Sequence, residues 1–214
     1  MTEPELIVVD DVADEVVGLF LEIQPDTILL TGGETPRALY ERMAELDHDW
    51  TETEFFLSDE RCVPFEDERS NARMCQEVLV SRAGGQAYWI NGADCDADGY
   101  EDVLRERFRD RPVFELALYG LGPDGHTASL FPGRPEVDVT DRWVVRVPDP
   151  GWEPFVPRVS LTVPALSGSP LGVLMVSGED KREPLRRLME GGDIPASRLS
   201  PERLVVVADH AAAA

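Results

Sequence analysis

Short apolar runs alternate along this chain with longer segments in which apolar residues recur at helical spacing. Continuous apolar runs of this kind predict strands that are buried on both faces. We expect strands at residues 6–9, 27–30, 54–57, 88–90, 114–119, 143–147, 159–163, 172–176 and 204–207. The helical spacing predicts helices at residues 12–23 and at about residues 36–46, 71–81, 100–108 and 181–189.

This alternation predicts an α/β fold in which a mostly parallel sheet is covered by helices on both faces. A length of 214 residues suits one domain with a full core. The chain contains no internal repeat and no linker long enough to divide it, so we expect a single domain over residues 1–214. The alanine-rich tail at residues 211–214 is expected to fray.

The formal net charge of −22 narrows the choice of partners. Nucleic acids and anionic membranes both require a basic surface, so neither is expected to bind. Lys181 is the only lysine among 20 basic residues. Two explanations fit this composition: a surface adapted to concentrated salt, which screens repulsion between carboxylates, or a GC-rich genome that replaces lysine by arginine.

The chain has no apolar run of about 18 residues, and residues 1–5 lack the basic start of a signal peptide. Cys62, Cys75 and Cys95 are odd in number and show no C-x-x-C spacing. We therefore expect reduced, buried thiols in a cytoplasmic protein, with no disulfide and no zinc site.

The most informative segment is the loop that follows the apolar run at residues 114–119. It contains three glycines, with Asp124 and His126 two positions apart. Loops at strand ends carry much of the chemistry of α/β enzymes. A carboxylate next to an imidazole predicts an oriented general base, so we expect the active site here.

Gly120, Gly122 and Gly125 also match the G-x-G-x-x-G pattern of dinucleotide-binding folds. That pattern requires a helix directly after the last glycine. Two prolines and a glycine within residues 131–135 would break such a helix, and Asp124 would repel a pyrophosphate. The nucleotide site is therefore disfavoured.

Other predicted strand ends carry polar groups. Gly32 and Gly33 precede a helix and could cradle an anion together with Thr35, although Thr35 could equally be an ordinary helix N-cap. Glu34 would repel an anion unless it points away. The third strand is followed by three charged residues, Asp59, Glu60 and Arg61. These residues could form a structural ion cluster, or they could bind a hydroxylated, anionic molecule.

Arg158 and Lys181 are cations at strand or loop ends, which is informative in so acidic a chain. Together with the preceding segments, they occur in blocks that resemble the 6-phosphogluconolactonases, relatives of the glucosamine-6-phosphate deaminases. The blocks are residues 31–40, 59–64 with 70–71, 120–132, 158–162 and 177–181, in the family's order. The resemblance implies a modified Rossmann-like, three-layer α/β sandwich that needs no metal or organic cofactor.

The resemblance also implies a role for each site residue. His126 would be the general base that activates water, with Asp124 orienting its ring or capping the loop. Arg61 would stabilise the developing oxyanion or bind substrate hydroxyls. The residues expected to bind the sugar phosphate are Gly32, Gly33, Thr35, Asp59, Asn71, Arg158 and Lys181.

The implied reaction is hydrolysis of a sugar-phosphate lactone by a monomer or weak homo-oligomer. A deaminase of the same family would carry an acidic residue in an Asn-Glu-Pro-like segment, whereas this chain has Ser129 to Pro132 there. It would also tend to lack Arg61. A sugar-phosphate-sensing regulator would normally carry a helix-turn-helix segment, which the acidic sequence does not suggest.

Overall fold

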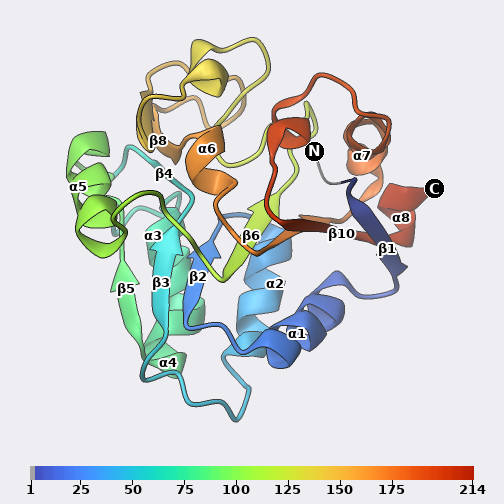
Figure 1. The fold of residues 1–214 in the computed structure, drawn as a ribbon, viewed down its shortest axis with the longest axis horizontal. Helices are drawn as coiled ribbons and strands as arrows, with labels where there is room; N and C mark the ends of the chain where they lie inside the picture. Colours follow the sequence, from blue (N-terminus) through green and yellow to red (C-terminus); the bar gives the residue numbers. More distant parts are fainter. Residues whose placement is uncertain (1–2) are drawn as a thin grey trace.

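A sheet of seven parallel strands runs through the molecule (Figure 1). The computed structural model describes residues 3–214, and Met1 and Thr2 of the N-terminal segment discussed above lie outside them. The strand order is β1-β10-β9-β6-β2-β3-β5. These strands are β1 (Glu5–Val9), β2 (Thr27–Leu30), β3 (Glu54–Leu57), β5 (Gln86–Tyr88), β6 (Leu116–Gly120), β9 (Leu171–Val176) and β10 (Arg203–Asp209).

Helices lie between the strands in the chain, and the last one follows β10. They are α1 (Val12–Ile23), α2 (Glu34–Met43), α3 (Asn71–Cys75), α4 (Ser81–Ala83), α5 (Ala97–Arg107), α6 (Val163–Leu166), α7 (Arg182–Met189) and α8 (His210–Ala213). Helix α1 packs on α2 and contacts β9 and β10 through its buried apolar stripe. Within residues 3–214, no helix has both the length and the apolar character needed to cross a membrane.

The predicted α/β fold is confirmed, and β2, β3 and α1 have the predicted bounds. The predicted helix at 71–81 is divided into α3, a π-helical segment η1 (Gln76–Val80) and α4. The short strand β5 lies two residues earlier than predicted, because it pairs with β3 only as far as Tyr88. These differences depend on pairing and packing between distant segments, which local periodicity does not report.

A second, antiparallel sheet is the main departure from the predicted arrangement. It consists of β4 (Asp59–Arg61), β8 (Arg158–Leu161) and β7 (Val144–Val147), with β8 in the middle. We predicted β7 and β8 as strands but did not separate them from the parallel sheet. No strand was predicted at β4, because its three charged residues show no apolar pattern.

The C-terminal tail was expected to fray, and that prediction is wrong. Residues His210–Ala213 form α8, which lies beside β1 (Figure 1). The Asp209 side chain caps this helix by accepting a hydrogen bond from the Ala212 amide at 2.7 Å, and Ala212 is buried. Alanine has the highest helix propensity, so one cap and one buried contact are enough to order the segment.

The prediction of three reduced thiols is also wrong. Cys62 and Cys95 form a disulfide, with their Cα atoms 4.8 Å apart, and only Cys75 is free and buried. Cys62 directly follows β4, and Cys95 lies in the turn before α5. The tertiary structure brings together two cysteines separated by 33 positions, and their spacing gives no sign of it. The cysteines therefore no longer argue for a reducing compartment.

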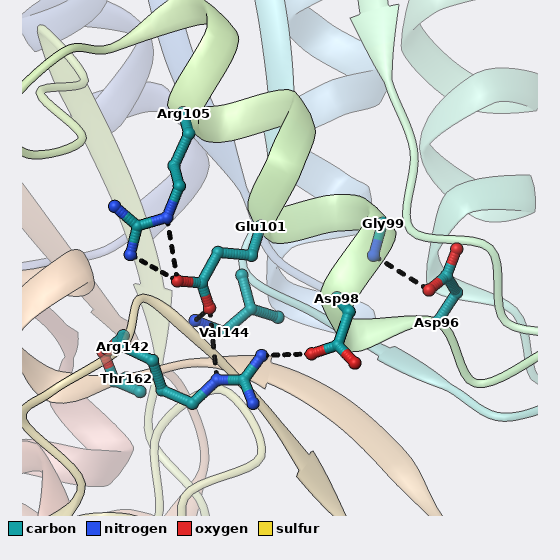
Figure 2. A network of polar contacts seen from close by, with 8 residues as sticks. All are labelled: Asp96, Asp98, Gly99, Glu101, Arg105, Arg142, Val144 and Thr162. Atoms are coloured by element: carbon teal, nitrogen blue, oxygen red, sulfur yellow. Dashed lines mark hydrogen bonds and ion pairs between the residues drawn. The ribbon is translucent and has the colours of Figure 1, made fainter.

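A buried carboxylate joins the small sheet to the body of the protein (Figure 2). Glu101 of α5 accepts hydrogen bonds from Arg105 at 2.6 Å, from Arg142 at 3.1 Å and from the Val144 amide of β7 at 3.3 Å. The Thr162 hydroxyl donates to the Arg142 carbonyl at 2.9 Å. This network fixes the start of β7 against α5.

The order in which the chain visits the strands determines where a crevice opens at the edge of the sheet. From β2 the chain moves outward to β3 and β5, then returns to β6 on the other side of β2 and continues to β9 and β10. The connections after β2 and β6 therefore diverge, which opens a crevice at the carboxyl ends of these strands. The small sheet lies at this same edge, because Ser58 links β3 directly to β4.

Buried tyrosines complete the backbone hydrogen bonding where β2 and β3 end. The Tyr40 hydroxyl accepts from the Thr31 amide at 2.8 Å and donates to its carbonyl at 2.9 Å. The Tyr100 hydroxyl does the same for Leu57, at 2.8 and 3.0 Å. Each tyrosine therefore takes the place of a missing neighbouring strand.

We predict that Tyr100→Phe destabilises the fold by about 1–3 kcal/mol, because it leaves the buried Leu57 amide without an acceptor. Urea denaturation followed by circular dichroism measures this loss. Tyr88→Phe is the matched control, since the Tyr88 hydroxyl bonds the Glu54 carboxylate at a less buried position. Equal losses in both variants would contradict the role given to Tyr100.

Candidate active site

A cavity of about 200 Å³ opens in the crevice at the carboxyl ends of β2, β3, β6 and β9. Every predicted site residue except Asp124 and Thr35 lines it. The lining residues are Thr31, Gly32, Gly33, Asp59, Arg61, Asn71, Gly120, Leu121, Gly122, Pro123, His126, Ala128, Trp152, Glu153, Arg158 and Lys181. Loops far apart in the sequence therefore meet at one place.

The loop after β6 folds back so that Asp124 and His126 face each other. The Gly122 amide donates to the His126 carbonyl at 2.8 Å and closes the turn. Asp124 Oδ1 accepts from the His126 amide at 3.0 Å and lies 2.5 Å from His126 Nδ1. Burial alone would raise the pKa of Asp124, but its hydrogen bonds with His126 and the charge of that ring lower the pKa below its ordinary value.

Asp124 is therefore a carboxylate at neutral pH and accepts the Nδ1 proton of His126. This fixes the tautomer and leaves Nε2 free to accept a proton. The imidazole is also held from the side by the Phe131 ring, whose centroid lies 4.8 Å away. The imidazole is therefore held in one orientation by Asp124 and Phe131.

The glycines of this loop serve the turn itself. A Cβ on Gly122 would overlap the His126 ring, and one on Gly125 would come within 2.7 Å of Ile194. Gly125 also has φ +91°, which favours glycine. The next helical element after β6 is the 3₁₀ segment η2 (Pro135–Asp138), so the crossover helix of a dinucleotide site is replaced by turns.

The loop after β2 brings backbone groups to the opposite wall. Helix α2 begins at Glu34 with Gly33 as its N-cap, at φ +116° and without a side-chain cap. The alternative in which Thr35 caps this helix is therefore wrong, since Thr35 lies in its first turn. Glu34 is exposed and faces a smaller neighbouring pocket with Arg37, so its charge does not enter the main cavity.

Polar side chains of β4 and α3 form the third wall. The Asp59 carboxylate accepts from the Ser58 hydroxyl at 2.9 Å and from the Ser129 hydroxyl at 2.6 Å. Asn71 donates to the Asp59 carbonyl at 2.9 Å and accepts a short hydrogen bond from Arg61 Nη1. These contacts hold Asp59 and Arg61 side by side at the cavity.

Arg158 is buried, with only 4% of its surface exposed. Its Nη2 donates to the carbonyls of Trp152 at 2.9 Å and Pro154 at 3.1 Å, and its guanidinium lies 5.3 Å from the Phe131 ring centroid. Nε is buried and has no hydrogen-bond partner within residues 3–214. Burial lowers the pKa of Arg158, while the charges of Asp59 and Glu60 oppose this shift. This desolvated cation can bind an anion strongly.

Lys181 reaches the cavity from the segment after β9. Its side chain is 20% exposed, and Nζ lies 2.9 Å from Asp180 Oδ2. Asp180 is mostly exposed, so this ion pair is weak and solvent-screened. Lys181 can therefore exchange it for an anion in the cavity.

Sequence reasoning missed Trp152 and Glu153, which line the cavity from the loop between β7 and β8. The sequence of this loop has no periodic pattern. Its one feature that could have indicated a site is a tryptophan among prolines and a glycine, and that tryptophan is partly exposed in the structure. No group of three or more His, Cys, Asp or Glu residues suited to a metal ion occurs within residues 3–214.

Comparison with known proteins agrees with this geometry. The model of the family described as glucosamine-6-phosphate isomerases/6-phosphogluconolactonase matches residues 8–208. A 6-phosphogluconolactonase from Thermotoga maritima is 35% identical over 192 residues, covering 88% of this chain and 86% of its own. One from Caulobacter vibrioides is 38% identical over 176 residues, covering 78% and 73%.

A solved structure shows the same fold. The crystal structure of 6-phosphogluconolactonase from Thermotoga maritima superposes with a TM-score of 0.83 at 32% identity, covering 98% of this chain and 100% of that chain. The overall fold is therefore one already known from experiment.

We predict that Gly122→Ala displaces the His126 ring from Asp124, because the added Cβ would occupy the position of the imidazole. The low-field proton resonance of His126 Nδ1–H, observed by NMR, should move or disappear. Gly120→Ala is the control, since nothing lies within 4 Å of a Cβ at that position. An unchanged resonance in Gly122→Ala would contradict the described pairing.

Proposed function

We propose that this chain, which belongs to the family of glucosamine-6-phosphate isomerases and 6-phosphogluconolactonases, hydrolyses 6-phospho-D-glucono-1,5-lactone to 6-phosphogluconate in the oxidative pentose phosphate pathway. One observation carries the proposal. The Asp124–His126 pair opens onto a cavity that also contains three cations, Arg61, Arg158 and Lys181. A general base and an anion-binding region are what hydrolysis of a phosphorylated lactone requires.

In the proposed mechanism, His126 Nε2 takes a proton from water as the water oxygen attacks the lactone carbonyl carbon. The carbonyl π electrons move to oxygen and give a tetrahedral oxyanion. When the carbonyl re-forms, the bond to the ring oxygen breaks and the imidazolium returns its proton to that oxygen. Imidazole suits both steps, because its ring nitrogen can accept a proton in the first step and return it in the second.

Arg61 is proposed to stabilise the oxyanion or to bind substrate hydroxyls. Its Nη1 is engaged with Asn71 and the Arg69 carbonyl, while its Nε is buried without a partner among the described residues. A donor that is fixed and desolvated before the reaction favours developing negative charge. Asp59 and Asn71 are proposed to bind the sugar.

The phosphate is proposed to bind at Gly32, Gly33, Thr35, Arg158 and Lys181. Uncapped backbone N–H groups at the start of α2 and two cations converge on this part of the cavity. The segment that carries an acidic residue in deaminases is apolar and buried here at Leu130 and Phe131. This difference favours the lactonase over the deaminase.

The same proposal includes a cytoplasmic protein that acts as a monomer or weak homo-oligomer on a small-molecule substrate. Hydrolysis of freshly generated 6-phosphogluconolactone, corrected for the spontaneous rate, tests the function. Release of ammonia from glucosamine 6-phosphate tests the deaminase alternative. Ammonia release without lactone hydrolysis would overturn the proposal.

We predict that His126→Ala lowers kcat about 10²–10⁴-fold, the usual contribution of a general base. Asp124→Asn should lose less, because the imidazole remains and only its orientation and tautomer are disturbed. Both variants should keep the far-UV circular dichroism spectrum. A His126→Ala variant that keeps more than half of the wild-type kcat would exclude His126 as the base.

We predict that Lys181→Ala raises KM for the phosphorylated lactone about tenfold or more, since it removes a charged hydrogen bond to the phosphate. Residual turnover of unphosphorylated gluconolactone should change little. Arg182→Ala is the matched control, because this neighbouring cation is exposed and bonds the Ala211 carbonyl outside the cavity. Equal losses with both lactones would assign Lys181 another role.

A further inference from the structure

Glu60 is a buried carboxylate at the active site that does not line the cavity. Only 1% of its surface is exposed, and it lies on β4 between Asp59 and Arg61. Side chains alternate across a strand, so Asp59 and Arg61 share the face toward the cavity while Glu60 points to the opposite side. Glu60 therefore cannot act by touching the substrate.

Four hydrogen-bond donors surround the Glu60 carboxylate. Oε1 accepts from the amides of Arg61 at 2.7 Å and Asn71 at 2.8 Å. Oε2 accepts from the Ser70 hydroxyl at 2.8 Å and from the Ala72 amide at 2.8 Å. The carboxylate thus joins the end of β4 to the first turn of α3.

Both segments held by Glu60 carry cavity residues. The Asn71 side chain accepts from Arg61 Nη1 and donates to the Asp59 carbonyl. Asn71 also packs so closely on Gly32 that a Cβ there would overlap its amide group. A shift of α3 relative to β4 would therefore move Asn71 away from Arg61 and from the loop after β2.

We infer that Glu60 is a positioning residue, which holds Arg61 and Asn71 in register for the reaction by bridging β4 and α3. This inference rests on the proposed function for its kinetic readout. A carboxylate suits the position because it accepts at both oxygens. The amide of glutamine would place an NH₂ group against backbone or hydroxyl donors on one side.

The test compares Glu60→Gln with Glu101→Gln. Glu101 is also a buried carboxylate that bridges two elements (Figure 2), and it does not line the cavity. Glu60→Gln should lower kcat about 10–100-fold, as small misplacements of catalytic groups do, with KM nearly unchanged. Glu101→Gln should lower Tm and keep kcat. The inference would be overturned if both variants lost kcat and their Tm values were equal.

A double-mutant cycle separates positioning from general damage to the fold. In an Arg61→Ala background, Glu60→Gln should lower kcat by a clearly smaller factor than in the wild-type background, because one of the two groups that Glu60 positions is gone. The same fold-loss in both backgrounds would overturn the inference. If Glu60→Gln does not fold, Glu60→Asp enters the same cycle, since its shorter side chain cannot reach all four donors.

One readout does not depend on turnover. The Arg61 Nε–H cross-peak in an NMR spectrum of the isotope-labelled protein should move in Glu60→Gln and stay in place in Glu101→Gln. An unmoved Arg61 cross-peak in Glu60→Gln would overturn the inference even if the wild-type protein proved inactive toward the lactone. Failure of the proposed function and failure of this inference are thereby distinguished.

Discussion

The active site depends on burying charged groups between the parallel sheet and the small antiparallel sheet. Asp59, Glu60 and Arg158 are each at most 4% exposed. Burial raises the pKa of Glu60, and its four hydrogen bonds oppose that shift. A buried charge is tolerated only when hydrogen bonds replace the lost water. Segments beside the small sheet supply most of these bonds: the start of α3 bonds Glu60, two serine hydroxyls bond Asp59, and the loop before β8 bonds Arg158.

The topology explains why so short a strand as β4 has this importance. Arg61 pairs directly with Arg158 in the antiparallel register, which brings two like charges to one end of the cavity. Such a pair is unfavourable unless nearby anions balance it. Asp59 and Glu60 supply negative charge beside it. Both guanidinium groups line the cavity, where an anionic ligand can reach them.

Much of the fold was predictable, because β2, β3 and α1 are specified by local apolar periodicity and end at turn residues. Most of the candidate site was predictable too, since each strand end carried an unusual polar group. Strand β4 was not predictable, because it is stabilised by pairing with β8, whose residues lie about 100 positions later in the sequence. Trp152 was missed for a similar reason: the carbonyl of this residue is held by Arg158, and nothing in the local sequence reports that contact.

The location of the cations also gives a physical explanation of how so acidic a chain can bind an anion. With a net charge of −22, the long-range field repels a phosphate ester. Exposed arginines such as Arg186 and Arg198 pair with surface carboxylates, which leaves their charge locally neutralised. Arg61 and Arg158 instead bond mainly to carbonyl and amide oxygens, so their charge is oriented without being cancelled. Selectivity for an anion therefore depends on which groups hold the arginines, and the overall charge of the chain matters less at this range.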